Sequence, residues 1–150
     1  MRGTVAYCGP HPVNHHAQPT LRRLAAAYLA AAVPFLLLDS AWLATMSERL
    51  YRPAIGHLMR PGFDLGAALA FYALYFAGVV AFAVRHADSG RAAMLRGAGF
   101  GLVCYATYDL TNQATLAGWP WRVTLADLVW GAFATGISAW VSHRIVFARR

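Results

Sequence analysis

The 150-residue chain contains no lysine, and its only basic side chains besides histidine are thirteen arginines. It has only six acidic residues, so its formal net charge is +7. A nucleic-acid-binding protein interleaves such charges with aromatic residues on an exposed surface. Here the arginines lie between long apolar runs, where they suit anionic lipid headgroups and the rules of membrane orientation. We therefore predict no nucleic-acid partner.

Cysteines and catalytic motifs are also scarce. Cys8 lies in a polar tail and Cys104 inside an apolar run, so the two do not form a disulfide framework. The chain has no serine or cysteine nucleophile motif, Walker-type loop, H-E-x-x-H or C-x-x-C pair. His11, His15 and His16 lie in the same tail without a second group of ligands, so we predict no metal site and no cofactor. An enzyme is the less favoured class.

Apolar residues, by contrast, are abundant. They make up 59% of the chain, and its mean hydropathy is +0.43, whereas soluble domains contain about 45–50% apolar residues. About 20 helical residues cross a hydrocarbon core of about 30 Å. Four runs have that length, and none alternates with the period of two that a barrel strand requires. We predict an all-α, integral membrane four-helix bundle over residues 24–147, with spans at about 24–45, 65–84, 95–116 and 123–147.

Residues 1–23 have a different character. They lack the apolar core of a cleavable signal peptide, and Pro10, Pro12 and Pro19 interrupt any helix. We predict a disordered cytoplasmic N-terminal tail.

Short connections between the runs predict antiparallel neighbouring helices in one bundle. The arginines predict the orientation, because cytoplasmic segments carry the excess of basic residues. On one side of the predicted bundle, the two tails and the loop around residues 85–96 together hold nine arginines. On the other side, the loop at 46–64 and the turn near residue 120 hold four. We predict that both termini are cytoplasmic and that the protein lies in the cytoplasmic (inner) membrane.

Three aspartates, Asp39, Asp109 and Asp127, lie within the predicted spans. An ionisable side chain at mid-membrane costs at least about 2.5–3.5 kcal/mol, so each needs a partner, a water-filled cavity or a proton. With both termini inside, Asp39 and Asp109 fall past the midpoints of outward-running helices, and Asp127 lies near the outer end of the last helix. This common depth predicts a shared polar cavity that opens to the outside.

Polar and aromatic residues accompany these aspartates. Tyr105 and Asn112 share a helical face with Asp109, and the spacing D-x-x-W places an indole one turn after both Asp39 and Asp127. The predicted ligand or proton site comprises the three aspartates together with Trp42, Tyr72, Tyr75, Tyr105, Tyr108, Asn112 and Trp130.

Three functions are open at this point. The first is a carrier or receptor whose cavity binds a proton, a cation or a small hydrogen-bonding solute. The second is a structural or assembly subunit, in which the aspartates only bind neighbouring helices at about 0.6–2 kcal/mol per hydrogen bond. The third is a membrane enzyme acting on a lipid or isoprenoid, with an aspartate pair as general acid and base. The expected partners are the lipid bilayer and a small-molecule ligand.

Gly97 and Gly101 form a G-x-x-x-G near the start of the third run. This spacing lets two helices approach closely, and we interpret it as packing within the bundle. The alternative is a homodimer contact.

The strings LLLDSAWLA, IGHLMRP, FYALYFAG, GLVCYATYDLTNQATLAGWP and ADLVWG occur in that order between residues 24 and 140. In this they resemble a family of small bacterial membrane proteins, domain of unknown function 2177, and YATYDLTN followed by GWP is the most specific part. The resemblance implies a bacterial multi-helix membrane protein and no particular activity. The tail up to about Arg22 resembles an extension outside the family pattern.

Overall fold

A computed structural model describes residues 19–147 of the protein. Its long helices are α1 (Leu21–Met46), α3 (Leu65–Gly78), α4 (Gly90–Thr115) and α5 (Trp121–Val146). Shorter helical segments follow α1, namely η1 (Ser47–Tyr51), α2 (Arg52–Ile55) and η2 (Gly56–Leu58), and η3 (Val79–Val84) continues α3. No strand occurs in this part of the chain, so the prediction of an all-α fold is confirmed.

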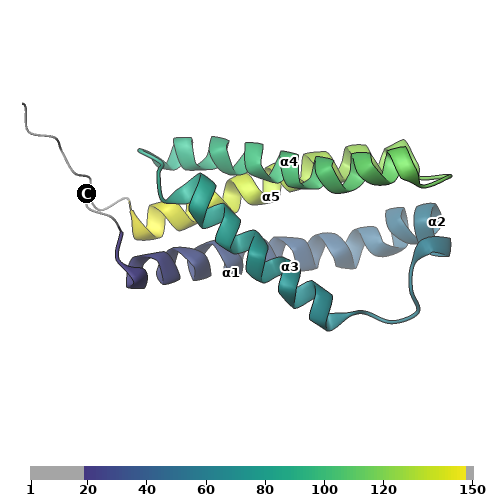
Figure 1. Ribbon diagram of the computed structural model, residues 1–150, viewed down its shortest axis with the longest axis horizontal. Helices are drawn as coiled ribbons and strands as arrows, with labels where there is room; N and C mark the ends of the chain where they lie inside the picture. Colours follow the sequence, from purple (N-terminus) through teal and green to yellow (C-terminus); the bar gives the residue numbers. More distant parts are fainter. Residues whose placement is uncertain (1–18, 148–150) are drawn as a thin grey trace, which may run out of the picture.

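The long helices are not all parallel to one axis. In Figure 1, α1, α4 and α5 lie along the long axis of the molecule, and α3 crosses α1 diagonally. The first helix begins at Leu21, three residues before the predicted start, because the Thr20 hydroxyl accepts a hydrogen bond from the Arg23 N–H at 3.4 Å. The prediction of a disordered tail falls mostly on residues 1–18, outside the described residues.

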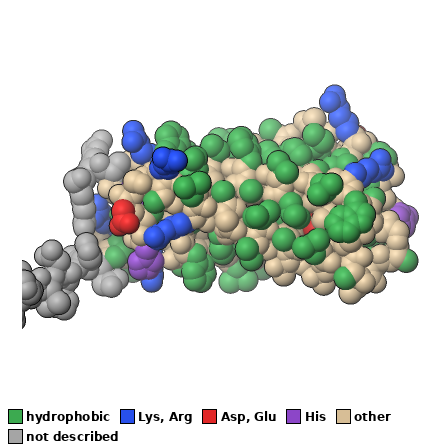
Figure 2. Space-filling view, turned by 90° about the horizontal axis from the view of Figure 1, so that it is seen from above, with side chains coloured by type: hydrophobic (Ala, Val, Ile, Leu, Met, Phe, Trp, Pro, Cys, Tyr) green, Lys and Arg blue, Asp and Glu red, His purple; other side chains and the backbone are tan. Residues whose placement is uncertain are grey.

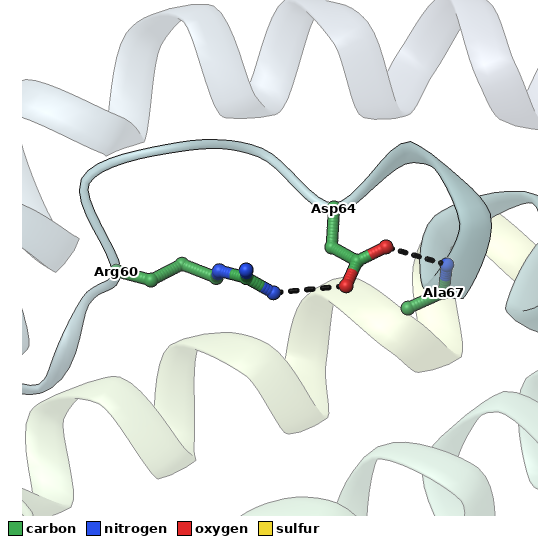
Figure 3. A network of polar contacts seen from close by, with 3 residues as sticks. All are labelled: Arg60, Asp64 and Ala67. Carbon is green, nitrogen blue, oxygen red and sulfur yellow. Dashed lines mark hydrogen bonds and ion pairs between the residues drawn. The ribbon is translucent and has the colours of Figure 1, made fainter.

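Asp64 defines where α3 begins. Its Oδ1 accepts a hydrogen bond from the Ala67 N–H at 3.1 Å, and its Oδ2 binds Arg60 Nη1 at 2.8 Å (Figure 3). A side-chain acceptor at this position satisfies one of the free N–H groups of the first turn. Arg60 therefore pairs with a carboxylate of its own loop rather than with the aspartates inside the bundle.

Contacts between α1 and α5 show that the two helices are antiparallel. The Ser142 hydroxyl donates to the Ala27 carbonyl at 2.8 Å, and the Trp130 indole donates to Asp39 at 3.2 Å. Moving twelve residues forward on α1 thus moves the contact twelve residues back on α5. The tight turn between α4 and α5 contains Gly118 at φ +80°, a conformation that favours glycine. Antiparallel neighbours were predicted and are confirmed.

Many residues inside the bundle are small, although Phe35 and Phe76 are also buried there, and many large apolar residues lie on the outside. Ala27, Ala31 and Ala134 are fully buried, whereas Leu37, Leu74 and Val129 are 69, 77 and 71% exposed. Large exposed apolar side chains along helix centres are unfavourable in water and favourable in lipid. Figure 2 shows arginine and histidine side chains gathered at the two ends of the long axis, with hydrophobic side chains spread over the largely uncharged surface between them. This distribution fits a bilayer-spanning bundle.

Three helical segments of the described chain are long and apolar enough to cross a membrane: Leu21–Leu58, Leu65–Val84 and Trp121–Val146. The remaining long helix, α4, has 26 residues and hence the required length, but Arg91, Arg96 and Asp109 dilute its apolar character. It lies antiparallel beside α5 (Figure 1). That α4 also crosses the membrane remains a prediction, supported by its packing along a helix that does qualify.

Candidate functional site

Asp39 links three helices through hydrogen bonds to its side chain. It lies on α1 and is 7% exposed. Its Oδ2 accepts a hydrogen bond from the Tyr72 hydroxyl of α3 at 2.5 Å, and its Oδ1 accepts one from the Trp130 indole of α5 at 3.2 Å. Both carboxylate oxygens therefore have donors, which offsets much of the cost of burying the group.

Asp127 is held by a residue from outside the long helices. The Tyr51 hydroxyl, at the end of η1, donates to Asp127 Oδ1 at 2.5 Å. The same hydroxyl accepts a hydrogen bond from the Trp42 indole at 2.8 Å. Trp42, Tyr51 and Asp127 thus form a hydrogen-bonded chain from α1 through η1 to α5.

The two D-x-x-W patterns meet face to face. Trp42 and Trp130 stack with ring centroids 4.4 Å apart and planes 10° apart. Each indole binds away from its own helix: Trp130 reaches Asp39 directly, and Trp42 reaches Asp127 through Tyr51. The spacing predicted an aspartate and an indole on neighbouring turns, and the structure shows that the indoles exchange partners across the α1–α5 interface.

Asp109 differs from the other two aspartates. Its side chain is fully buried, at 0% exposure, and neither Oδ1 nor Oδ2 has a hydrogen-bond partner among residues 19–147. It lies within electrostatic range of Asp127, which in turn lies within range of Asp39. An unpaired buried carboxyl group costs about 1–3 kcal/mol or more. Such a group calls for a functional explanation.

The three residues, which we call the aspartate cluster, lie at a similar level along the bundle. Asp109 is six residues before the end of α4 at Thr115, and Asp127 is six residues after the start of α5 at Trp121. At 1.5 Å per residue, both lie about 9 Å from these helix ends. The contact of Asp39 with Trp130, one turn after Asp127, brings the third aspartate to the same region.

Two of the remaining predicted residues, Tyr105 and Tyr75, contact α5. The Tyr105 ring packs on Gly131 of α5, within electrostatic range of Asp39 and Asp127. Tyr75 is buried, but its hydroxyl pairs with Thr135 at 2.5 Å rather than with an aspartate.

Two predicted residues make no hydrogen bond to an aspartate among residues 19–147. Tyr108 is 59% exposed and packs edge-on against Trp119, although it lies within electrostatic range of Asp109 and Asp127. Asn112 is half-buried, and no hydrogen bond within residues 19–147 joins its side chain to an aspartate.

Tyr51 is the residue that the sequence interpretation missed. It lies in the segment predicted to be a loop, whereas the structure continues α1 with the π-helical turn η1. Tyr51 and Trp42 are nine residues apart, which is two and a half turns of a regular helix and places them on opposite faces. The π-helical turn η1 alters this relation, and in the structure the Trp42 indole and the Tyr51 hydroxyl are hydrogen-bonded.

Glycines bring α4 against α5 beside the cluster. A Cβ atom on Gly97 would lie 2.6 Å from the Ala139 Cβ, and one on Gly101 would overlap Gly131 and Thr135. The G-x-x-x-G therefore packs within the bundle, as predicted. This close approach carries Asp109 of α4 toward Asp127 of α5.

Two of the grooves that the described residues form are apolar and lie on the bundle surface. One, of about 650 Å³, runs between α4 and α5 and includes Leu102, Leu125 and Phe133. The other, of about 500 Å³, runs between α1 and the α3–η3 helix. Neither is lined by a member of the aspartate cluster. Within residues 19–147 no three histidine, cysteine, aspartate or glutamate side chains converge as metal ligands.

The family model described as "Predicted membrane protein (DUF2177)" matches residues 24–144. No curated protein and no solved structure matches the chain. The matched range includes the whole aspartate cluster and Tyr51.

Proposed function

Since the chain belongs to the DUF2177 family of predicted membrane proteins, we propose that it is a proton-linked carrier or receptor of the bacterial cytoplasmic membrane. Asp109 is the group that binds and releases the proton. The observation that carries this proposal is the complete burial of Asp109 with both oxygens unpaired. Buried ionisable groups on membrane helices commonly mark proton or ion pathways.

The packing around the cluster favours a proton over a larger ligand. Asp39 and Asp127 are engaged by tyrosine and tryptophan donors, and the stacked indoles of Trp42 and Trp130 leave no room between their rings. A proton needs no cavity, and its binding neutralises the one carboxylate of the aspartate cluster that has no donor. The small-solute site with an outward-facing polar cavity stays a broader prediction.

The placement of the cluster supports exchange with one side of the membrane. The short distance from Asp109 and Asp127 to the α4–α5 turn brings both near one end of the bundle. If both termini are cytoplasmic, as the arginine distribution predicts, that end faces outward. The site would then take its proton from the outside.

The experiment is infrared difference spectroscopy of the full chain in lipid nanodiscs, with the pH changed in H₂O and D₂O. We expect a carboxylic acid band that responds to pH and shifts on deuteration in the parent. Asp109→Asn should remove this band, and Asp88→Asn, which alters an exposed aspartate, should leave it unchanged. A parent spectrum without such a band, or a band that persists in Asp109→Asn, would overturn the proposal.

A structural role is the second candidate, because both carboxylate oxygens of Asp39 accept hydrogen bonds from other helices. Thermal unfolding of Asp39→Asn, Asp109→Asn and Asp127→Asn in detergent, across pH and a metabolite panel, separates the two roles. Equal loss of folding in all three variants, with no pH or ligand response in the parent, favours a structural subunit. A folded Asp109→Asn that loses the pH response favours proton binding.

A further inference from the structure

The groove between α1 and the α3–η3 helix has a charged end. Its lining is Leu21, Leu24, Ala25, Tyr28, Leu29, Ala77, Val80, Ala81 and Arg85. Apart from Arg85 and the Tyr28 hydroxyl, the side chains that line the groove present apolar carbon surface to it. On each helix the lining extends over about eight residues, or about 12 Å.

Arg85 occupies the level at which a membrane helix meets lipid headgroups. The apolar segment Leu65–Val84 ends at the residue before it. The Nε group of Arg85 donates to His86 Nε2 at 2.6 Å. Its Nη groups have no acceptor among residues 19–147, and neither of the two ion pairs found there involves it. The forked end of the guanidinium is thus available to a ligand.

The surroundings of Arg85 are strongly basic. Arg22, Arg23, Arg91, Arg96 and Arg144 lie at the same end of the bundle, where Asp88 is the one acidic residue within the described range. Arg23 bonds to the Val146 carbonyl at 3.2 Å and lies over the Phe147 ring, so it is partly engaged. The excess of positive charge attracts anions to this end of the groove.

We propose that this groove binds one acyl chain of an anionic phospholipid, whose phosphate pairs with Arg85. Leu21 and Leu29, on the groove, are 81 and 62% exposed and would be covered by the chain. Arginine suits phosphate because its N–H groups form paired hydrogen bonds with two oxygens. Basic pockets between membrane helices on the cytoplasmic side have the chemistry that binds such headgroups. The site is separate from the aspartate cluster and does not depend on its function.

Native mass spectrometry of the full chain from mixed micelles of phosphatidylglycerol and phosphatidylcholine tests the proposal. The parent should retain phosphatidylglycerol in preference to phosphatidylcholine. Arg85→Gln should weaken that retention about fivefold, in line with the loss of one basic contact near the headgroups. Arg91→Gln removes an exposed charge at the same end without touching the groove, and it should retain the lipid as the parent does.

A second variant separates the chain from the headgroup. Ala25→Trp fills the groove at an exposed lining position and keeps every charge, so it should also reduce retention of phosphatidylglycerol. Equal losses in Arg85→Gln and Arg91→Gln would show diffuse attraction and overturn the proposal, as would a parent without preference. If Arg85→Gln does not fold, Arg85→Lys, which keeps the charge and loses the paired geometry, takes its place.

Discussion

The Tyr51 hydroxyl lies 2.5 Å from Oδ1 of Asp127 and joins the segment after α1 to the last helix. It also accepts the indole N–H of Trp42, so a single oxygen satisfies groups from two helices. Loss of this oxygen would leave a buried carboxylate and an indole each without a partner. Tyr51 is thus the link between the end of α1 and the aspartate cluster.

Replacing Tyr51 with phenylalanine should therefore destabilise the bundle by about 1–3 kcal/mol, the cost of leaving buried polar groups unpaired. Thermal unfolding in detergent measures this change. Tyr28→Phe is the matched control, because the Tyr28 hydroxyl donates to the Ala73 carbonyl at an exposed position, at 3.2 Å. If the two variants unfold at the same temperature, the Trp42–Tyr51–Asp127 chain contributes no special stability.

The position of Tyr51 shows where sequence interpretation reached its limit. The three aspartates and both indoles were found from hydrophobic runs and the helical period, which depend only on local chemistry. The bond of Tyr51 to Asp127 spans 76 positions and needs a π-helical turn that no residue pattern in SERLY announces. For the same reason the exchange of indole partners between α1 and α5 could not be read from two D-x-x-W strings.

Tyr108 shows that adjacency in sequence does not predict a shared position in the bundle. It neighbours Asp109 in sequence and was grouped with it, yet consecutive helical residues point about 100° apart. The structure places Asp109 in the interface and Tyr108 at the surface. The four-residue spacing that joins Tyr105 to Asp109 was informative on α4, whereas adjacency and the seven-residue spacing to Asn112 were not.

Asp109→Leu should stabilise the protein, by about 1–3 kcal/mol, because it removes an unpaired buried carboxyl group and keeps a similar shape. Stability gained at the expense of function is typical of such sites. In Asp109→Leu the unfolding temperature should rise, and the infrared carboxyl band measured on the same sample should disappear. Asp127→Leu is the comparison: it leaves the Tyr51 hydroxyl without its acceptor and should destabilise. A lower unfolding temperature for Asp109→Leu would indicate a partner for Asp109.

Gly101→Ala should separate α4 from α5, since the added Cβ would overlap the Gly131 carbonyl and the Thr135 side chain. Overpacking of this kind costs about 1–3 kcal/mol and sometimes more. Gly99→Ala lies two residues away on the same helix with nothing within 4 Å of its added Cβ. It should be neutral or slightly stabilising, because alanine favours helix over glycine. Unfolding temperatures of both variants in one detergent give the comparison; similar values would contradict close packing at Gly101.

The acidic cap of α3 offers a surface test. Asp64→Ala should destabilise by about 1 kcal/mol, because it removes the acceptor for the Ala67 N–H. Arg60→Gln removes only the ion pair, whose side chains are 69 and 48% exposed, and should cost less, at most about 0.5 kcal/mol. Unfolding measured at low and high salt separates the effects, since salt screens the exposed ion pair more than the hydrogen bond of the cap. Equal losses for both variants would contradict this division.

The orientation and the crossing of α4 can be tested together. The loop containing Asp88 precedes α4 and the turn containing Ala117 follows it. If α4 crosses the bilayer with both termini cytoplasmic, a membrane-impermeant maleimide added to intact cells should label Ala117→Cys and not Asp88→Cys, with Cys8 and Cys104 first replaced by alanine. Permeabilised cells should label both positions, which controls for accessibility.

Labelling of both positions in intact cells, or of neither, would show that α4 does not cross the bilayer. The reverse pattern, with only Asp88→Cys labelled, would place the aspartate cluster near the cytoplasmic surface. The proton would then come from the inside, because the cluster lies about 9 Å from the α4–α5 turn.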